Sequence, residues 1–321
     1  MDSLRMIARF GGILISVAVL MESDGCSSYE GISSSNSIKL RRVQPQTNDA
    51  PLVGISDVDK DIPAGNISNT KSIAIVLGVE KYRNLQSATY AKHDALIFKE
   101  YAVRVLGVPD DRNHLYMKID DEVTKAEFDK LFSAEGWLAK RSEVQSDVYI
   151  YFSGHGAPDL KEKTPYLIPC DADPNYPSQM GYSLKKLYDE IGHLKARSVT
   201  IFLDVCFSGL TRQNTTLLAE ARPMGISVVL PTVFSGDIAS FTASGGDQIG
   251  SSYPSEWHGL FTYFLLKGLR KDADTNGDGS ITVSELEDFL VTNVTRTAGQ
   301  LDREQTPQVM TRNKQRVLVK Y

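Results

Sequence analysis

Cysteine and positive charge are both scarce in this sequence. Its 321 residues include three cysteines, which are Cys26, Cys170 and Cys206. Three cysteines are too few for a disulfide framework, so each one has to be interpreted singly. Lys and Arg number 35 against 40 Asp and Glu, which gives a net charge of −5. Sequence-independent binding to nucleic acid needs a basic face, so we expect no nucleic-acid partner.

The N-terminus lacks an apolar run long enough for a comfortable membrane span. Its apolar residues cover only 10–21, preceded by Arg5 and Arg9 and followed by small and polar residues up to Cys26. Such a run is typical of the core of a signal peptide. We expect residues 1–26 to be a signal peptide or lipoprotein-type signal, and the protein to be secreted or held in the cell envelope. The sequence is compatible with three outcomes for this segment: cleavage near Cys26, lipidation of Cys26, or retention as an uncleaved membrane anchor.

Residues 27–70 lack the apolar periodicity of a folded segment. They are rich in Ser, Asn, Pro, Asp and Gly, and their apolar residues are scattered. This composition cannot bury enough apolar surface to offset the entropy lost on ordering. We therefore expect a disordered tether over 27–70 and one folded domain over 71–321.

From residue 71 onward, short apolar runs alternate with helical patterns. Continuous apolar runs, typical of strands buried on both faces, cover 73–78, 148–152 and 199–204. Shorter strands are predicted at 114–117, 239–243 and 317–319, and helices at 91–106, 124–139, 182–194 and 259–270. This alternation predicts an α/β fold with a mostly parallel sheet covered by helices on both faces. In such sheets, sites form at the carboxyl ends of the strands.

One histidine and one cysteine follow directly on predicted buried strands. Of the five histidines, only His155 follows a buried strand and is flanked by glycines, and Cys206 follows the next buried strand. A nucleophilic thiol needs a neighbouring base, and an imidazole supplies one and can later protonate the leaving amine. His155 precedes Cys206 by about fifty residues, which is the order and separation found in caspases.

The motifs around these two residues resemble those of the caspase-like cysteine peptidase family, and more narrowly its metacaspase and bacterial caspase-like branch. They are YFSGHG at 151–156 and DVCFSG at 204–209. Further matches are GVEKY at 78–82, HDA at 93–95 and HGLFT at 258–262. The resemblance implies a caspase-like three-layer sandwich, a cysteine-type endopeptidase and protein or peptide substrates.

The resemblance also implies a mechanism that needs no cofactor for the chemistry. Cys206 attacks the scissile carbonyl carbon, and His155 assists proton transfer. The backbone N–H groups of Gly156 and Cys206 hold the developing oxyanion. A third member of a catalytic triad is not evident in the sequence.

The expected specificity is for Arg or Lys before the cleaved bond. Asp204 stands where animal caspases have glutamine, and the resemblance to metacaspases places it with Asp94 and Ser153 in a substrate pocket. Two partly buried carboxylates repel each other and gain from a cation between them. The alternative is that Asp204 only orders the turn before the cysteine. Self-processing after Arg212 is a further hypothesis.

Residues 274–285 (DTNGDGSITVSE) match the EF-hand calcium-loop pattern at every defining position. The expected Ca²⁺ ligands are side-chain oxygens of Asp274, Asn276 and Asp278, the carbonyl of Ser280, a water on Thr282, and both carboxylate oxygens of Glu285. Gly279 permits the sharp turn. EF-hands usually occur in pairs and this one is single, so a structural staple is favoured over a switch. The alternative is a turn of the same shape without tightly bound metal.

Two rival functions are compatible with parts of this sequence. The first is a non-catalytic calcium-binding envelope or signalling module on a caspase-like fold, since a fold does not fix a function. The second is a legumain-like peptidase that favours Asn. The intact His155 and Cys206 argue against the first, and Asp204 argues against the second.

Overall fold

The computed structural model describes residues 29–32, 39–42, 55–66, 69–159, 161, 163–208, 236–245 and 248–321. The chain divides into two compact units, Met1–Leu52 and Val53–Tyr321. In the first unit, β1 (Tyr29–Ile32) pairs antiparallel with β2 (Lys39–Arg42), within the stretch expected to be a disordered tether. The expected signal at 1–26 and the hypothetical processing site at Arg212 lie outside the described residues.

Six strands form the central sheet of the second unit, in the order β14-β10-β9-β5-β3-β4. Their bounds are β3 (Ile73–Gly78), β4 (Leu115–Ile119), β5 (Asp147–Ser153), β9 (Ser198–Asp204), β10 (Ile238–Thr242) and β14 (Gln308–Thr311). Neighbouring strands are parallel except for β14, which is antiparallel to β10. Every residue of β3, β5 and β9 is buried, as the continuous apolar runs predict, and every residue of β10 is buried as well.

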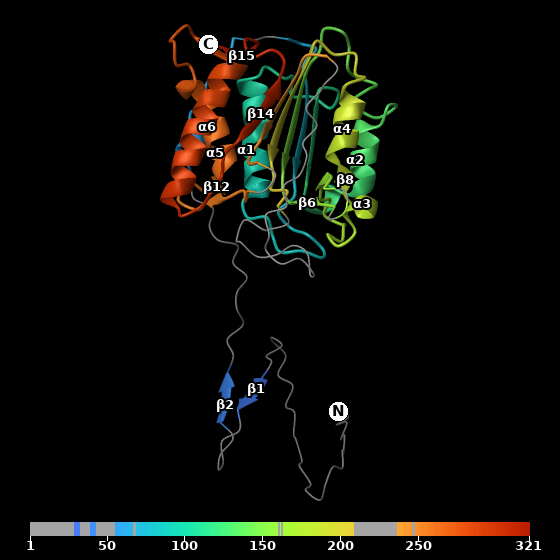
Figure 1. The fold of residues 1–321 in the computed structure, drawn as a ribbon, viewed down its shortest axis with the longest axis vertical. Coiled ribbons are helices and arrows are strands. Elements are labelled where there is room, and N and C mark those ends of the chain that lie inside the picture. Colours follow the sequence, from blue (N-terminus) through green and yellow to red (C-terminus); the bar gives the residue numbers. More distant parts are fainter. Residues whose placement is uncertain are drawn as a thin grey trace, which may run out of the picture. The chain divides into compact units, whose positions relative to one another are not determined.

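Helices cover both faces of this sheet (Figure 1). One face carries α1 (Ala91–Arg104), α5 (Leu260–Lys267) and α6 (Val283–Gln300), and the other carries α2 (Lys125–Phe132) and α4 (Leu184–Ile191). Side chains alternate along β3, so that Val76 packs in the cluster with α1 while Ile75 packs in the cluster with α2 and α4. The expected α/β three-layer sandwich is thereby confirmed.

Shorter elements decorate the edges of the sandwich. They are η1 (Asp57–Asp59), η2 (Asp120–Glu122), α3 (Pro177–Met180), β6 (Gly156–Pro158), β7 (Pro165–Leu167), β8 (Tyr182–Ser183), β11 (Ser252–Tyr253), β12 (His258–Gly259), the π-helical η3 (Gly268–Asp272), β13 (Ser280–Thr282) and β15 (Val317–Lys320). The strand predicted at 317–319 forms within β15, but it pairs with β13 and not with the central sheet. None of the helices in the described part of the chain is long and apolar enough to cross a membrane.

Residues 55–66 differ from the tether expected there, because they are part of the second unit and pack into it. Val58 is fully buried in the hydrophobic cluster that contains α1. The Tyr101 hydroxyl donates a hydrogen bond to the Val58 carbonyl at 2.8 Å. The Gly65 N–H donates to the Arg104 carbonyl, also at 2.8 Å. The few apolar residues of this stretch suffice because α1 and its neighbours supply the rest of the buried surface.

Candidate active site

The pairing of β5 with β9 brings the two sequence motifs together. These strands are parallel, and their register places Ser153 directly beside Asp204. The Gly154 N–H continues the pairing by donating to the Asp204 carbonyl at 3.3 Å. His155 lies two residues after Ser153, and Cys206 lies two residues after Asp204. Both residues therefore follow the carboxyl ends of neighbouring strands, on the same side of the sheet.

His155 is held by a loop that follows β3. Its backbone N–H donates to the Tyr82 hydroxyl at 2.7 Å, and the two rings lie 4.7 Å apart between centroids. Its Nε2 lies 2.8 Å from the Gln86 carbonyl oxygen. A carbonyl oxygen only accepts, so Nε2 carries a proton and Nδ1 is the basic nitrogen of the neutral ring. The imidazole, 3% exposed, is therefore fixed in both orientation and tautomer.

Cys206 follows the end of β9 and contacts two polar groups. Its Sγ is 2.8 Å from the Ser208 Oγ and donates to the Gln248 carbonyl at 2.9 Å. Gly156 packs closely on this segment, because a Cβ at that position would meet the Cys206 carbonyl oxygen at 2.8 Å. The glycine after His155 is thus required for close approach of the two motifs. Cys206 itself is 6% exposed.

The three residues expected to form the acidic pocket are neighbours and are fully buried. The Ser153 hydroxyl donates to the Asp94 carboxylate at 3.3 Å, and Ser153 lies beside Asp204 in the sheet. Asp204 Oδ2 accepts from the Thr262 hydroxyl at 2.7 Å and from its N–H at 3.3 Å. The sheet, α1 and α5 together therefore place two carboxylates at the ends of β5 and β9 that lead to His155 and Cys206.

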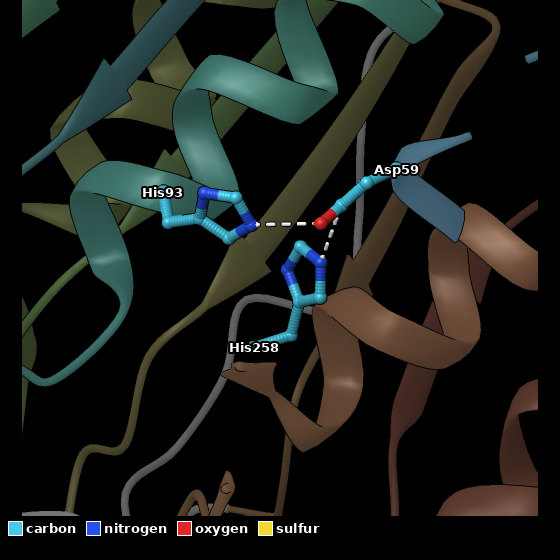
Figure 2. A group of neighbouring side chains, drawn as sticks. All are labelled: Asp59, His93 and His258. Carbon is cyan, nitrogen blue, oxygen red and sulfur yellow. Dashed lines mark hydrogen bonds and ion pairs between the residues drawn. The ribbon is translucent and has the colours of Figure 1, made fainter. Parts of the chain in front are cut away.

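Asp94 also belongs to a chain of charged side chains that extends away from the cysteine. Its Oδ1 lies 2.7 Å from Nδ1 of the fully buried His258, whose Nε2 lies 2.9 Å from Asp59 Oδ1. Burial lowers the pKa of His258, but hydrogen bonds to Asp59 and Asp94 outweigh it and raise that pKa to about 9. Burial raises the pKa of Asp59, but hydrogen bonds from His258 and His93 outweigh it and hold that pKa well below its ordinary value. The network is shown in part in Figure 2.

The loop at 274–285 has the backbone of a calcium loop. Asp274 accepts hydrogen bonds from the N–H groups of Gly277 at 2.9 Å, Asp278 at 3.2 Å and Gly279 at 3.0 Å. Gly277 and Gly279 have positive φ of 73° and 78°, which favours glycine at both positions. The carboxylate at the first loop position thus organises the turn.

The last residues of this loop, Thr282 and Glu285, cap the N-terminus of α6. Glu285 Oε2 accepts from the Thr282 N–H at 2.9 Å and forms a capping box at the start of α6. Its Oε1 is buried and has no hydrogen-bond partner among the described residues. The carboxylates of Asp274, Asp278 and Glu285 do not all lie within 4.8 Å of one another. Bidentate binding by Glu285 therefore requires its side chain to leave the cap.

Several residues at the site were not singled out from sequence. The Gln86 and Gln248 carbonyls have no sequence signature, since every residue has a backbone carbonyl, and Asp59 lies in η1, outside the family motifs. His258 and Thr262 do have a signal, because they lie in the HGLFT segment that matches the family motifs. The positions Asp94, Ser153, His155, Asp204 and Cys206 lie together at one edge of the sheet, as expected.

The family model of the caspase domain matches residues 71–318, which is most of the chain. The chain belongs to the caspase-domain family. The domain is accordingly that of a cysteine peptidase, a hydrolase whose substrates are proteins or peptides. This confirms the family resemblance drawn from the YFSGHG and DVCFSG motifs. Among curated proteins, none matches the chain.

Three solved structures are similar to this domain at low sequence identity. A protein of Geobacter sulfurreducens is 16% identical to this chain, with a TM-score of 0.50. The match covers 75% of this chain and 92% of the Geobacter chain. Caspase-1 of Spodoptera frugiperda is 14% identical with a TM-score of 0.45, covering 79% and 91%. A structure of pro-sf-caspase-1 is 15% identical with a TM-score of 0.44, covering 79% and 96%. The first of these agrees with the three-layer fold.

Proposed function

We propose that this protein is an endopeptidase that uses Cys206 as nucleophile and His155 as base, and that it cleaves after Arg or Lys. The register of β5 with β9 carries the proposal, because it directs both motifs from one edge of the sheet. The close packing of Gly156 on the Cys206 carbonyl supports the same arrangement.

In the proposed mechanism, Nδ1 of His155 takes the thiol proton while the Gln86 carbonyl holds Nε2. The thiolate attacks the scissile carbonyl carbon, and the N–H groups of Gly156 and Cys206 hold the oxyanion. The C–N bond then breaks as the imidazolium gives its proton to the leaving amine. Water, deprotonated by His155, hydrolyses the thioester and releases the acid and the free thiol.

The proposed preference for Arg or Lys rests on Asp204, with Asp94 and Ser153 beside it. Asp94 is hydrogen-bonded to His258 at 2.7 Å. Asp204 accepts from the neutral donor Thr262. A guanidinium or ammonium group of the substrate would gain from the negative charge of the Asp204 carboxylate, which is already buried in the folded protein.

The test is hydrolysis of fluorogenic peptides ending in Arg, Lys, Asp or Asn by the wild-type chain. Cys206→Ala and His155→Ala are the variants, and Cys170→Ala is the matched control for removal of a buried thiol. We expect turnover of the Arg and Lys peptides by wild type and by Cys170→Ala, and none by the other two. Turnover of the Asn peptide alone would favour the legumain-like alternative. No turnover and no labelling of Cys206 by a thiol-reactive probe would favour a non-catalytic module.

We also propose that the loop at 274–285 binds Ca²⁺, supported by its backbone geometry and by the buried Glu285 Oε1 that lacks a hydrogen bond. Asp274, Asn276, Asp278, Ser280, Thr282 and Glu285 would hold the ion. The strand β13 within the loop pairs with β15, in the place where a second EF-hand loop would ordinarily pair. We therefore favour a structural role, in which the bound ion would hold the C-terminal strand β15 against the loop.

Calorimetric titration with Ca²⁺ tests the loop directly. Glu285→Gln should weaken binding at least tenfold, about 1.4 kcal/mol, because it removes the bidentate carboxylate. Glu287→Gln, two positions on and paired with Lys314, is the matched control and should bind as wild type does. Equal Ca²⁺ affinity in wild type and Glu285→Gln would contradict the assignment.

A further inference from the structure

Three side chains from distant parts of the sequence converge next to the acidic pocket. They are Asp59 on η1, His93 on α1 and His258 at the junction of β12 and α5, drawn in Figure 2. Each offers one ligand atom, and these atoms all lie within 4.8 Å of one another. Among the described residues, this is the one group of three or more His, Cys, Asp or Glu side chains that meets this criterion.

The carboxylate of Asp59 lies between the two imidazoles. Its Oδ1 is 2.9 Å from His258 Nε2, and its Oδ2 is 3.2 Å from His93 Nε2. The two rings are 4.7 Å apart between centroids. Tetrahedral Zn²⁺ with bonds of about 2.0–2.1 Å sets its ligand atoms roughly 3.3 Å apart, which is close to both of these N···O distances, and a pair at the 4.8 Å limit would have to close by about 1.5 Å.

A second layer of contacts fixes two of these ligands. His258 Nδ1 lies 2.7 Å from Asp94 Oδ1, which is the carboxylate–histidine arrangement that orients an imidazole toward a metal. Asp59 Oδ2 accepts from the Ser56 N–H at 3.0 Å, within the capping box of η1. The side chain of His258 is fully buried and that of His93 is 18% exposed, so an ion would enter past His93.

We propose that Asp59, His93 and His258 form a binding site for a divalent transition metal of the Zn²⁺ class, with a fourth position open to solvent. Two imidazoles and one carboxylate suit Zn²⁺ and exclude Ca²⁺ and Mg²⁺, which prefer oxygen ligands. The ion would tie residues 55–66 to α1 and to the start of α5. It would also anchor His258 and, through it, Asp94, which contacts Ser153 in the proposed pocket.

The test is titration of the full chain with Co²⁺, whose visible absorption reports tetrahedral coordination, followed by displacement with Zn²⁺. All measurements use a Cys206→Ala background, because the thiol with His155 is itself able to bind these ions. The result is therefore independent of the proposed peptidase activity. We expect one equivalent of Co²⁺ to bind, without thiolate-to-metal charge transfer, and Zn²⁺ to raise the melting temperature.

Asp59→Asn and His93→Gln should each weaken binding at least tenfold and abolish the thermal shift. Asp57→Asn, in the same turn, and His193→Gln, at the exposed end of α4, are matched controls and should bind as the parent does. His258→Gln is buried, so it is informative only if circular dichroism shows a folded chain. Binding that persists unchanged in Asp59→Asn and His93→Gln would overturn the proposal, as would absence of binding to the folded parent.

Discussion

At the scale of single residues, surroundings separate the two cysteines that the structure describes. Burial, with the charge of Asp171 added to it, raises the pKa of the Cys170 thiol, which keeps that thiol protonated and unreactive. Cys206 instead lies against the Ser208 hydroxyl and the Gln248 carbonyl, at the edge of the sheet where His155 emerges. The same residue type is thus inert packing in one place and a candidate nucleophile in the other.

Asp204→Asn tests the charge of the pocket without changing its shape. The amide oxygen still accepts from Thr262, but the negative charge that would meet a substrate guanidinium is lost. We expect kcat/KM for Arg peptides to fall by about 100-fold, on the order of 3 kcal/mol. Labelling of Cys206 by a thiol-reactive probe should stay at the wild-type rate. Undiminished hydrolysis of Arg peptides would mean that Asp204 only orders the turn.

Gly156→Ala tests the close approach of the two motifs. The added Cβ would lie 2.8 Å from the Cys206 carbonyl oxygen and 2.7 Å from Phe207 Cδ1, so the backbone has to shift. We expect peptide hydrolysis to fall by at least 100-fold, because misplacement by about 1 Å is enough for such a loss. Gly299→Ala in α6 is the control, since nothing lies within 4 Å of the added Cβ. Equal rates for the two variants would count against this geometry.

At the scale of elements, an ion pair ties together the first residues of β5 and β9. Asp147 Oδ1 accepts from Arg197 Nε at 2.9 Å and from the Ser198 hydroxyl at 2.8 Å. Its Oδ2 accepts from Asn69 Nδ2 at 2.9 Å. Burial raises the pKa of Asp147, but these hydrogen bonds and the Arg197 charge outweigh it and lower that pKa below its ordinary 3.8. The cluster lies at the opposite end of the strands from the site, so it acts on stability.

The lowered pKa of Asp147 gives a pH dependence of known sign. Its stabilisation is complete above the unfolded pKa of 3.8 and is lost as the pH falls through the folded value. Asp147→Asn should reduce the free energy of unfolding by about 1–2 kcal/mol at neutral pH, because Arg197 is largely exposed and screened. The difference between variant and wild type should shrink below about pH 4. Urea unfolding at several pH values measures this, and a pH-independent difference would refute it.

At the scale of the whole molecule, the folded unit begins before the family match at residue 71. Val58 is buried in the same hydrophobic cluster as α1 and α5, and Ser56 donates to Glu256 Oε2 at 2.7 Å. A segment that looks like a tether by composition is therefore part of the core. Asp59 in this segment contacts His258, which in turn contacts Asp94 of the acidic pocket.

Val58→Ala measures what this packing contributes. Removing two buried methyl groups should cost about 2 kcal/mol with the cavity that is left. For a domain of this size, the melting temperature should fall by roughly 4–8 °C. Ile55→Ala, in the same segment but at a side chain 68% exposed, should leave it unchanged. Equal shifts for both variants would show that the segment does not dock in solution.

Local sequence features were enough to predict five of the six strands of the central sheet and the family to which the chain belongs. The buried strands at 73–78, 148–152 and 199–204 were expected almost to the residue, because a strand covered on both faces needs an unbroken apolar run. The helix expected over 124–139 ends at residue 132, where a series of turns begins. β14 was not expected, since its four residues at the edge of the sheet have no distinctive pattern.

What the sequence by itself determined is therefore the family and the layers of the fold. Motif residues such as His155 and Cys206 and apolar periodicity are local properties that a chain displays before it folds. Only the tertiary structure decided that Asp59 meets His258, 199 residues away, and that β13 pairs with β15. The physical reason is that contacts between distant segments depend on how complete helices and strands pack, and a turn without a distinctive residue pattern gives no sign of its partner.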